Sequence, residues 1–247
     1  MRRLLTLIFI LPIYCYSQTA VISDYKLNAV LAKDTNIRIK YPVIKTNNIK
    51  IDRAINKSIK DSLTTFDMSL ADKPVNVIID SLLKYGLNDL NYDVNYNSNG
   101  ILSLTINSES CGAYCSGGSI YLNYDLTNGK KIILDSLFIP TYISAFTKRV
   151  VIERASQIEK HKKYLKNELE KKSISKDEYD WALESINSCP DPIIINNFAL
   201  NKDYIEIFSP CSFPHAIMSL EPGIELKYKW SELKDKIDKR YKTKLIK

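Results

Sequence analysis

The chain has 247 residues, of which 45% are hydrophobic and 26% are charged, and it contains only 7 glycines and 9 prolines. This composition is typical of a folded globular protein and excludes collagen-like, purely coiled-coil and disordered chains. The formal net charge of +7 is a modest basic excess. Because the sequence has no nucleic-acid-binding motif, we do not expect nucleic acid as a partner.

Residues 1–17 have the features of a secretory signal peptide. Arg2 and Arg3 form a basic start, an apolar run follows, and small residues precede a predicted cleavage site before Gln18. We therefore predict an exported protein, periplasmic or extracellular, with a mature net charge of +5 once the two arginines are removed. A lipoprotein anchored on Cys15 is the alternative, which the bulky residue before it disfavours. No later stretch is apolar enough to span a bilayer, so we expect no membrane span.

The mature chain is predicted to begin with two strands, at Tyr25–Leu31 and Asn36–Ile44, that form a hairpin. Isoleucine or leucine then recurs every fourth residue over 49–66, which predicts an amphipathic helix. A second helix is expected to begin at Pro74, a favourable first-turn residue, and to end near Gly86.

Three strands with alternating apolar residues follow, at Leu90–Tyr96, Ile101–Asn107 and Ser119–Leu126. The alternation predicts an antiparallel meander with one buried face. The loop Cys111–Gly118 joins the second of these strands to the third, and loops carried on a rigid sheet are where binding surfaces usually lie.

The C-terminal half is predicted to begin with a long helix over Tyr142–Lys171, whose apolar positions become sparse toward its end. We therefore expect that end to extend into solvent. Ser175 and Glu178 form a capping box for the next helix. A terminal helix completes the half, after strands at Ile193–Leu200, Tyr204–Phe208 and Gly223–Trp230.

Together these elements predict an α+β fold in two halves, each a small antiparallel sheet backed by helices, joined by the long helix. The predicted segments are a signal peptide at 1–17, an N-terminal half at 18–139 and a C-terminal half at 140–247.

Four cysteines remain after the predicted cleavage: Cys111, Cys115, Cys189 and Cys211. An even number in an exported protein predicts two disulfides, which can pair in three ways. Because short loops are the easiest to close, Cys111–Cys115 with Cys189–Cys211 is favoured over a bridge between the two halves. A four-cysteine zinc site is the alternative, which would require thiolates to survive in an oxidising compartment.

The segment Asn123–Lys130 resembles the strand-and-turn signature of an exported bacterial family of unknown function. Members of that family include the ectodomains of lysozyme-sensing anti-sigma factors and the N-terminal modules of some peptidoglycan deacetylases. The resemblance covers nearly the whole mature chain. The other matching residues are Tyr41-Pro42, Ile55-Asn56, Leu134, Leu137, Phe138, Phe208-Ser209-Pro210, Pro214, Gly223 and Ser231-Glu232-Leu233-Lys234.

Two loops depart from the family pattern. Where the family commonly has Gly-Ala-His, this chain has Gly112-Ala113-Tyr114 between two cysteines, and where it often has tyrosine after proline, this chain has Cys211. Ligand binding through the missing histidine is therefore not implied here. The sequence also shows no transmembrane helix and no deacetylase domain, so we do not expect the family's signalling or catalytic partners.

The two cysteine-bearing loops, 111–118 and 210–216, form the predicted binding surface. Tyr92, Tyr96 and Tyr121 would extend this surface if they were exposed, although tyrosines at alternate strand positions are also typical of sheet packing. The alternative is that the disulfides only stabilise a small exported fold. The candidate binding residues are Tyr114, Gly117, Gly118, Phe213 and His215.

Few groups are available for catalysis. The two histidines are His161, which lies among lysines on a predicted solvent-exposed helix, and His215, a candidate ligand contact. Glu109 lies beside the first cysteine loop, either as a catalytic carboxylate or as a surface charge at the end of a sheet. No nucleophile, metal-binding or phosphate-binding motif is present. We therefore predict no catalytic residue, no metal and no cofactor.

The sequence thus favours an exported, non-catalytic binding module that acts at the cell wall or on a wall-directed protein such as a lysozyme. The predicted partners are peptidoglycan or a lysozyme-like protein, as the resemblance implies. A carboxylate-dependent enzyme acting on cell-wall polysaccharide is the alternative function.

Overall fold

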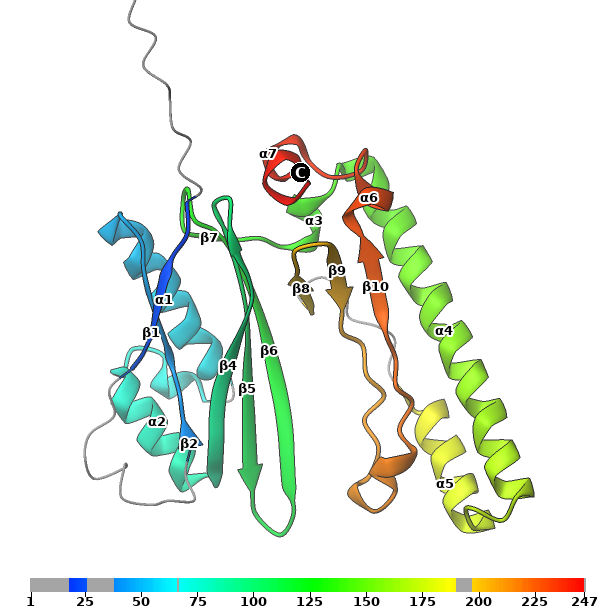
Figure 1. The fold of residues 1–247 in the computed structure, drawn as a ribbon. Helices are drawn as coiled ribbons and strands as arrows, with labels where there is room; N and C mark the ends of the chain where they lie inside the picture. Colours follow the sequence, from blue (N-terminus) through cyan, green and yellow to red (C-terminus); the bar gives the residue numbers. More distant parts are fainter. Residues whose placement is uncertain (1–17, 26–37, 66, 190–196, 247) are drawn as a thin grey trace, which may run out of the picture.

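The computed structural model shows an α+β protein built in layers (Figure 1). Two helices cover one face of a central five-stranded sheet, a three-stranded sheet lies against the other face, and a long helix packs on the outside of that smaller sheet. This arrangement confirms the predicted fold class. The predicted signal peptide lies outside the described residues, which are 18–25, 38–65, 67–189 and 197–246.

The first two helices form where the sequence predicts them. Helix α1 (Ile49–Leu63) is capped by the Asn48 side chain and buries the isoleucines of its apolar stripe. A short 3-10 turn, η2 (Met68–Leu70), follows it, and α2 (Val75–Lys84) begins directly after Pro74. Both helices pack their apolar faces on the central sheet, as their periodicity requires.

The predicted N-terminal hairpin is wrong in its details. The described strand is β1 (Val21–Asp24), which precedes the predicted one, and residues 26–31 lie outside the described residues. The second predicted strand splits: β2 (Arg38–Ile39) joins the central sheet in parallel with its neighbour, while β3 (Pro42–Lys45) pairs antiparallel with β1. Pro42 is the first residue of β3, a position that tolerates proline because a strand's first residue can lack an N–H donor.

The central sheet is a long meander with the strand order β2-β4-β5-β6-β7. Strands β5 and β6 extend to the two cysteines, so the predicted loop 111–118 is instead a tight hairpin tip. The chain turns at Gly112–Tyr114, and Cys111 lies directly opposite Cys115. The strands are β4 (Leu87–Ser98), β5 (Ile101–Cys111), β6 (Cys115–Asp125) and β7 (Lys130–Lys131).

In the C-terminal half, the predicted long helix, α4 (Pro140–Glu170), packs along one side of a three-stranded sheet. This sheet has the order β10-β9-β8, all antiparallel. The predicted strand Ile193–Leu200 is described only from residue 197 onward. The remaining elements are α3 (Leu134–Leu137), α5 (Lys176–Asn187), β8 (Phe198–Leu200), β9 (Tyr204–Ile207), η3 (His215–Leu220), β10 (Leu226–Lys229), α6 (Trp230–Leu233) and α7 (Lys239–Leu245).

The far end of α4 does not extend into solvent, contrary to the sequence prediction. Leu165 is fully buried there against Ala182 and Ile186 of α5, and the predicted capping box of Ser175 and Glu178 starts that helix. A small separate core results, because α5 packs on this end of α4 and covers Leu165.

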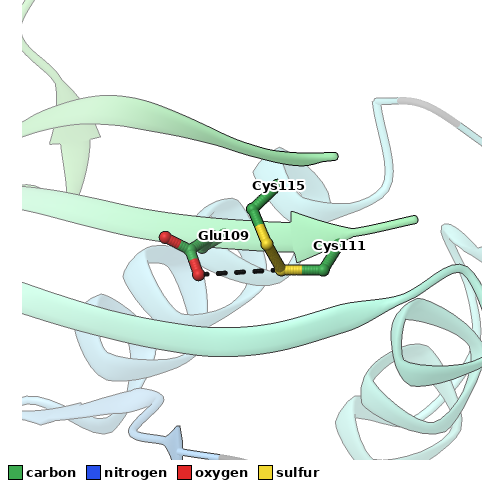
Figure 2. Close-up of side chains that lie close together, drawn as sticks. All are labelled: Glu109, Cys111 and Cys115. Atoms are coloured by element: carbon green, nitrogen blue, oxygen red, sulfur yellow. Dashed lines mark hydrogen bonds between the residues drawn. A yellow bond between two sulfur atoms is a disulfide. The ribbon is translucent and has the colours of Figure 1, made fainter. Parts of the chain in front are cut away.

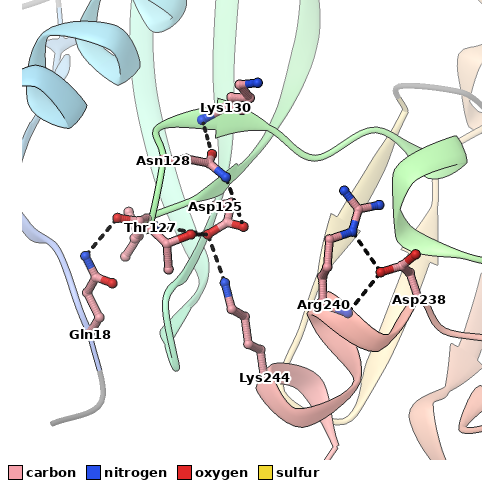
Figure 3. A network of polar contacts seen from close by, with 9 residues as sticks. Gln18, Asp125, Thr127, Asn128, Lys130, Asp238, Arg240 and Lys244 are labelled. Carbon is pink, nitrogen blue, oxygen red and sulfur yellow. Dashed lines mark hydrogen bonds and ion pairs between the residues drawn. The ribbon is translucent and has the colours of Figure 1, made fainter. Parts of the chain in front are cut away.

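The two halves share packing and hydrogen bonds. One apolar cluster combines Ile101 and Phe138 from the N-terminal half with Phe146 and Tyr228 from the C-terminal half. Polar contacts also connect the two halves at the end of the central sheet, where Lys244 of α7 forms an ion pair with Asp125, the last residue of β6 (Figure 3). The division between residues 139 and 140 stays a prediction. None of the helices within the described ranges is long and apolar enough to cross a membrane.

Candidate binding cleft

The cysteines form the two local disulfides that short-loop closure favoured, Cys111–Cys115 and Cys189–Cys211. A bridge between the two halves is therefore wrong. The first disulfide lies beside Glu109, whose Oε1 is 3.8 Å from the Cys111 sulfur (Figure 2). An oxidised sulfur carries no proton and is not a thiolate, so this close approach is neither a true hydrogen bond nor a zinc site.

The disulfide sets the shape of the hairpin tip. It joins residues that face each other across two antiparallel strands, with their Cα atoms 4.0 Å apart. Tyr114 at the turn is 73% exposed. Its ring lies 5.3 Å from the ring of His215, the first residue of η3. The tip of the N-terminal hairpin therefore meets a loop of the C-terminal half.

A cleft of about 1110 Å³ opens between this hairpin arm and the segment 208–221. It brings together residues from two stretches that lie about a hundred positions apart in the sequence. Phe213 is largely buried in the small core beneath η3, while the two glycines belong to β6 and are not in a loop. All five predicted binding residues line the cleft: Tyr114, Gly117, Gly118, Phe213 and His215.

A row of hydrogen-bonded polar side chains crosses the floor of the cleft. Ser119 Oγ donates to Asn107 Oδ1 at 2.7 Å, and Asn107 Nδ2 donates to Asn91 Oδ1 at 3.2 Å. Asn91 Nδ2 in turn donates to Asp89 Oδ1 at 2.7 Å, and the other oxygen of Asp89 pairs with Arg38 at 2.6 Å. The row spans β6, β5, β4 and β2, so it forms only when the sheet assembles.

Two aromatic side chains form a wall above this row. The rings of Tyr121 and Phe208 stack with centroids 3.9 Å apart and an interplanar angle of 7°. Burial raises the pKa of Tyr121 further above neutral, and its protonated hydroxyl can donate a hydrogen bond.

The other two tyrosines that the sequence singled out do not line the cleft. Tyr92 donates to Asp24 at 2.9 Å, and Tyr96 donates to the backbone carbonyl of Lys244 at 3.0 Å. Their role is structural, as strand tyrosines packed on neighbouring elements commonly show.

The charges along the cleft are mainly acidic. Glu109 and Glu221 both line it, and neither has a basic partner among the described residues. Partial burial raises the pKa of Glu221 above its ordinary value. The one arginine of the lining, Arg38, is engaged by Asp89. In a chain with a net charge of +7, this is a local concentration of acceptors.

His161 lies outside the cleft lining but supports it. Its ring nitrogen Nε2 is 2.7 Å from the carbonyl oxygen of Leu220 at the end of η3. It was predicted to be a solvated surface residue, and the structure instead shows a half-buried side chain that links α4 to this loop.

The structure is that of an α+β protein with a polar, aromatic-walled cleft between the hairpin of β5 and β6 and the segment 208–221. Two solved structures have a similar fold. A member of the DUF3298 family from Bacteroides fragilis NCTC 9343 has a TM-score of 0.53 and 17% identity, covering 90% of this chain and 93% of that one. A DUF3298 family protein from Pseudomonas aeruginosa PAO1 has a TM-score of 0.52 and 15% identity, covering 80% of this chain and 84% of that one.

No protein-family model matches the sequence, and no curated protein matches it either. At these identities the solved structures establish the fold alone. They agree with the resemblance to a family of unknown function, whereas the likeness to anti-sigma ectodomains and deacetylase modules stays a prediction.

Proposed function

We propose that the protein is an exported, non-catalytic binding module that acts at the cell wall or on a wall-directed protein such as a lysozyme. The observation that carries the proposal is the cleft itself, because the two cysteine-bearing segments that the sequence singled out meet there. The two disulfides are consistent with export.

The chemistry of the cleft suits recognition of a polar ligand. Amide and hydroxyl side chains on the floor offer paired donors and acceptors, and the aromatic wall offers a flat apolar contact. Pockets that combine a few well-placed polar groups with aromatic walls are typical binding sites.

One observation favours the enzyme as a second candidate. Glu109 and Glu221 line the same cleft, and the raised pKa of Glu221 is the property that a general acid needs. Glycoside hydrolysis commonly uses two such carboxylates.

A pull-down on purified peptidoglycan and on immobilised lysozyme, run beside a muramidase assay, separates the two candidates. We expect retention on at least one matrix without turnover of the polysaccharide. Tyr114→Ala and His215→Ala should weaken retention, whereas Tyr164→Ala, a change at an exposed tyrosine on α4, should not. Turnover that is lost in Glu221→Gln would favour the enzyme, and no retention on either matrix would refute the binding proposal.

A further inference from the structure

Strand β6 leaves most of its outer edge without a partner strand. The short strand β7 pairs only with Tyr124 and Asp125 at one end of β6. Within the described part of the chain, the stretch 115–123 has β5 on one side and no strand on the other.

The register shows which backbone groups point outward. Asn123 accepts a hydrogen bond from the backbone N–H of Ile132, on the side away from β5. Because these directions alternate along an antiparallel strand, Tyr121, Ser119 and Gly117 also direct their N–H and C=O groups to the open side. Among the described residues, none of the outward N–H and C=O groups of these three residues has a hydrogen-bond partner.

This edge also lacks the usual protection against strand pairing. Native edge strands are commonly short, or carry lysine, proline or a bulge that prevents another chain from pairing. The stretch 115–123 contains neither a charged residue nor a proline, and its register with β5 continues without a bulge.

Hydrogen-bond acceptors lie at both ends of this edge. A second cavity, of about 670 Å³, adjoins the cleft and shares Ser119 and Tyr121 with it. At the cleft end are Glu109 and Glu221, two carboxylates without a basic partner among the described residues, of which Glu109 accepts one hydrogen bond from Asn88. In the second cavity, Lys57 contacts one oxygen of Asp61, and the other oxygen is buried without a hydrogen-bond partner.

We propose that the partner presents an extended peptide segment that adds to the sheet as a strand along the open edge of β6. Its main chain pairs with the outward groups of Gly117, Ser119 and Tyr121, as in other cases of strand addition. Basic side chains of the peptide contact Glu109 and Glu221 at the end of the edge near the hairpin tip. A hydrogen-bond donor of the peptide contacts Asp61 at the other end. The proposal names the partner class for the cleft and thus rests on the proposed function.

A backbone substitution tests the pairing while leaving side chains in place. Gly117→Pro removes an outward N–H that β5 does not use, whereas Gly117→Ala keeps it. The alanine fits, because an added Cβ would meet only the Ser108 carbonyl oxygen, at 3.5 Å. The probe is a peptide in which lysine alternates with threonine, and its control is the same peptide with N-methylated backbone amides. Binding is measured by fluorescence anisotropy.

We expect the unmethylated peptide to bind the wild type and Gly117→Ala about equally. It should bind Gly117→Pro more weakly, by up to about tenfold, because one main-chain hydrogen bond is lost. The N-methylated peptide should not bind the wild type, an outcome that needs no protein variant. Equal binding of both peptides, or no binding of either, would overturn the proposal. So would a dimer of the free protein that Gly117→Pro abolishes, since the edge would then pair with a second copy. If lysozyme or peptidoglycan is retained regardless of Gly117→Pro, the strand-addition proposal fails while the proposed function stands.

Discussion

Substitution of Asn123 by alanine removes a polar link between the two halves of the protein. This buried side chain on β6 donates to the Phe198 carbonyl at 2.8 Å and accepts from the Leu200 N–H at 3.3 Å. The same N–H also donates to Ser103 Oγ at 3.0 Å. Asn123 and Ser103 therefore share one donor on β8, which fixes where the smaller sheet lies on the larger one.

The shared Leu200 N–H determines how much free energy of unfolding each variant loses. Asn123→Ala leaves the Phe198 carbonyl without a donor, so unfolding should become easier by about 1–3 kcal/mol. Ser103→Ala should cost about 0.5–1.5 kcal/mol, because Leu200 still has Asn123 as an acceptor. In the double variant the Leu200 N–H loses both acceptors, so its loss should exceed the sum of the single losses by about 1–2 kcal/mol.

Urea unfolding of the oxidised protein, monitored by circular dichroism, measures the free energies of unfolding of the wild type, the two single variants and the double variant. Ser116→Ala, at an exposed position on β6, serves as the control and should change stability little. Additive losses in the double variant would show that the two side chains do not share the Leu200 donor, and would refute the described joint between the sheets.

Three further perturbations test other parts of the fold. Burial acts to raise the pKa of Asp125, but hydrogen bonds from Thr127 and the contact with Lys244 lower it below its ordinary value of 3.8. Its contribution to stability is therefore complete above about pH 4 and lost as the pH falls through the folded pKa, so the stability deficit of Lys244→Met should shrink as the pH of the unfolding series is lowered from neutral to acid. Gly129→Ala should lower thermal stability by about 1–2 kcal/mol, because the residue has a φ of +72° and an added Cβ would lie 3.4 Å from the α1 backbone; an unchanged melting temperature would contradict the described turn. Replacing both members of Cys189–Cys211 with serine should cost about 3 kcal/mol, more than the same change at Cys111–Cys115, because it opens a longer loop; mass spectrometry of the unreduced wild type should find all four of these cysteines oxidised.

Much of the fold follows from local patterns in the sequence. The isoleucines of α1, the Asn48 cap and the capping box at Ser175 each act within a few residues, so they predict their helices directly. The turn at Asn99 and Gly100 is equally local, because both residues adopt the positive φ angles that an Asn-Gly hairpin turn requires.

The errors lie where contacts distant in sequence decide the outcome. The end of α4 has a sparse apolar pattern, and only the later helix α5 provides the partner that buries Leu165. Strand length at the hairpin tip depends on pairing between β5 and β6, so polar residues near Cys111 and Cys115 were assigned to a loop.

The candidate cleft was predictable only in part. Unusual cysteine spacing pointed to the two segments that meet there, and Tyr114 and His215 were found in this way. The polar row across the floor was missed, because Asn91, Asn107 and Ser119 lie on different strands and each alone is an ordinary polar strand residue.

Hydrogen exchange measured by mass spectrometry, with and without a bound wall partner, tests the cleft as the binding site most directly. The mature, oxidised protein would be compared alone, with soluble peptidoglycan fragments, and with lysozyme. We predict that the partner that is retained slows exchange in two segments, 107–121 and 208–221, which form the two sides of the cleft. Slowed exchange confined to other surfaces, such as the exposed face of α4, would contradict the account.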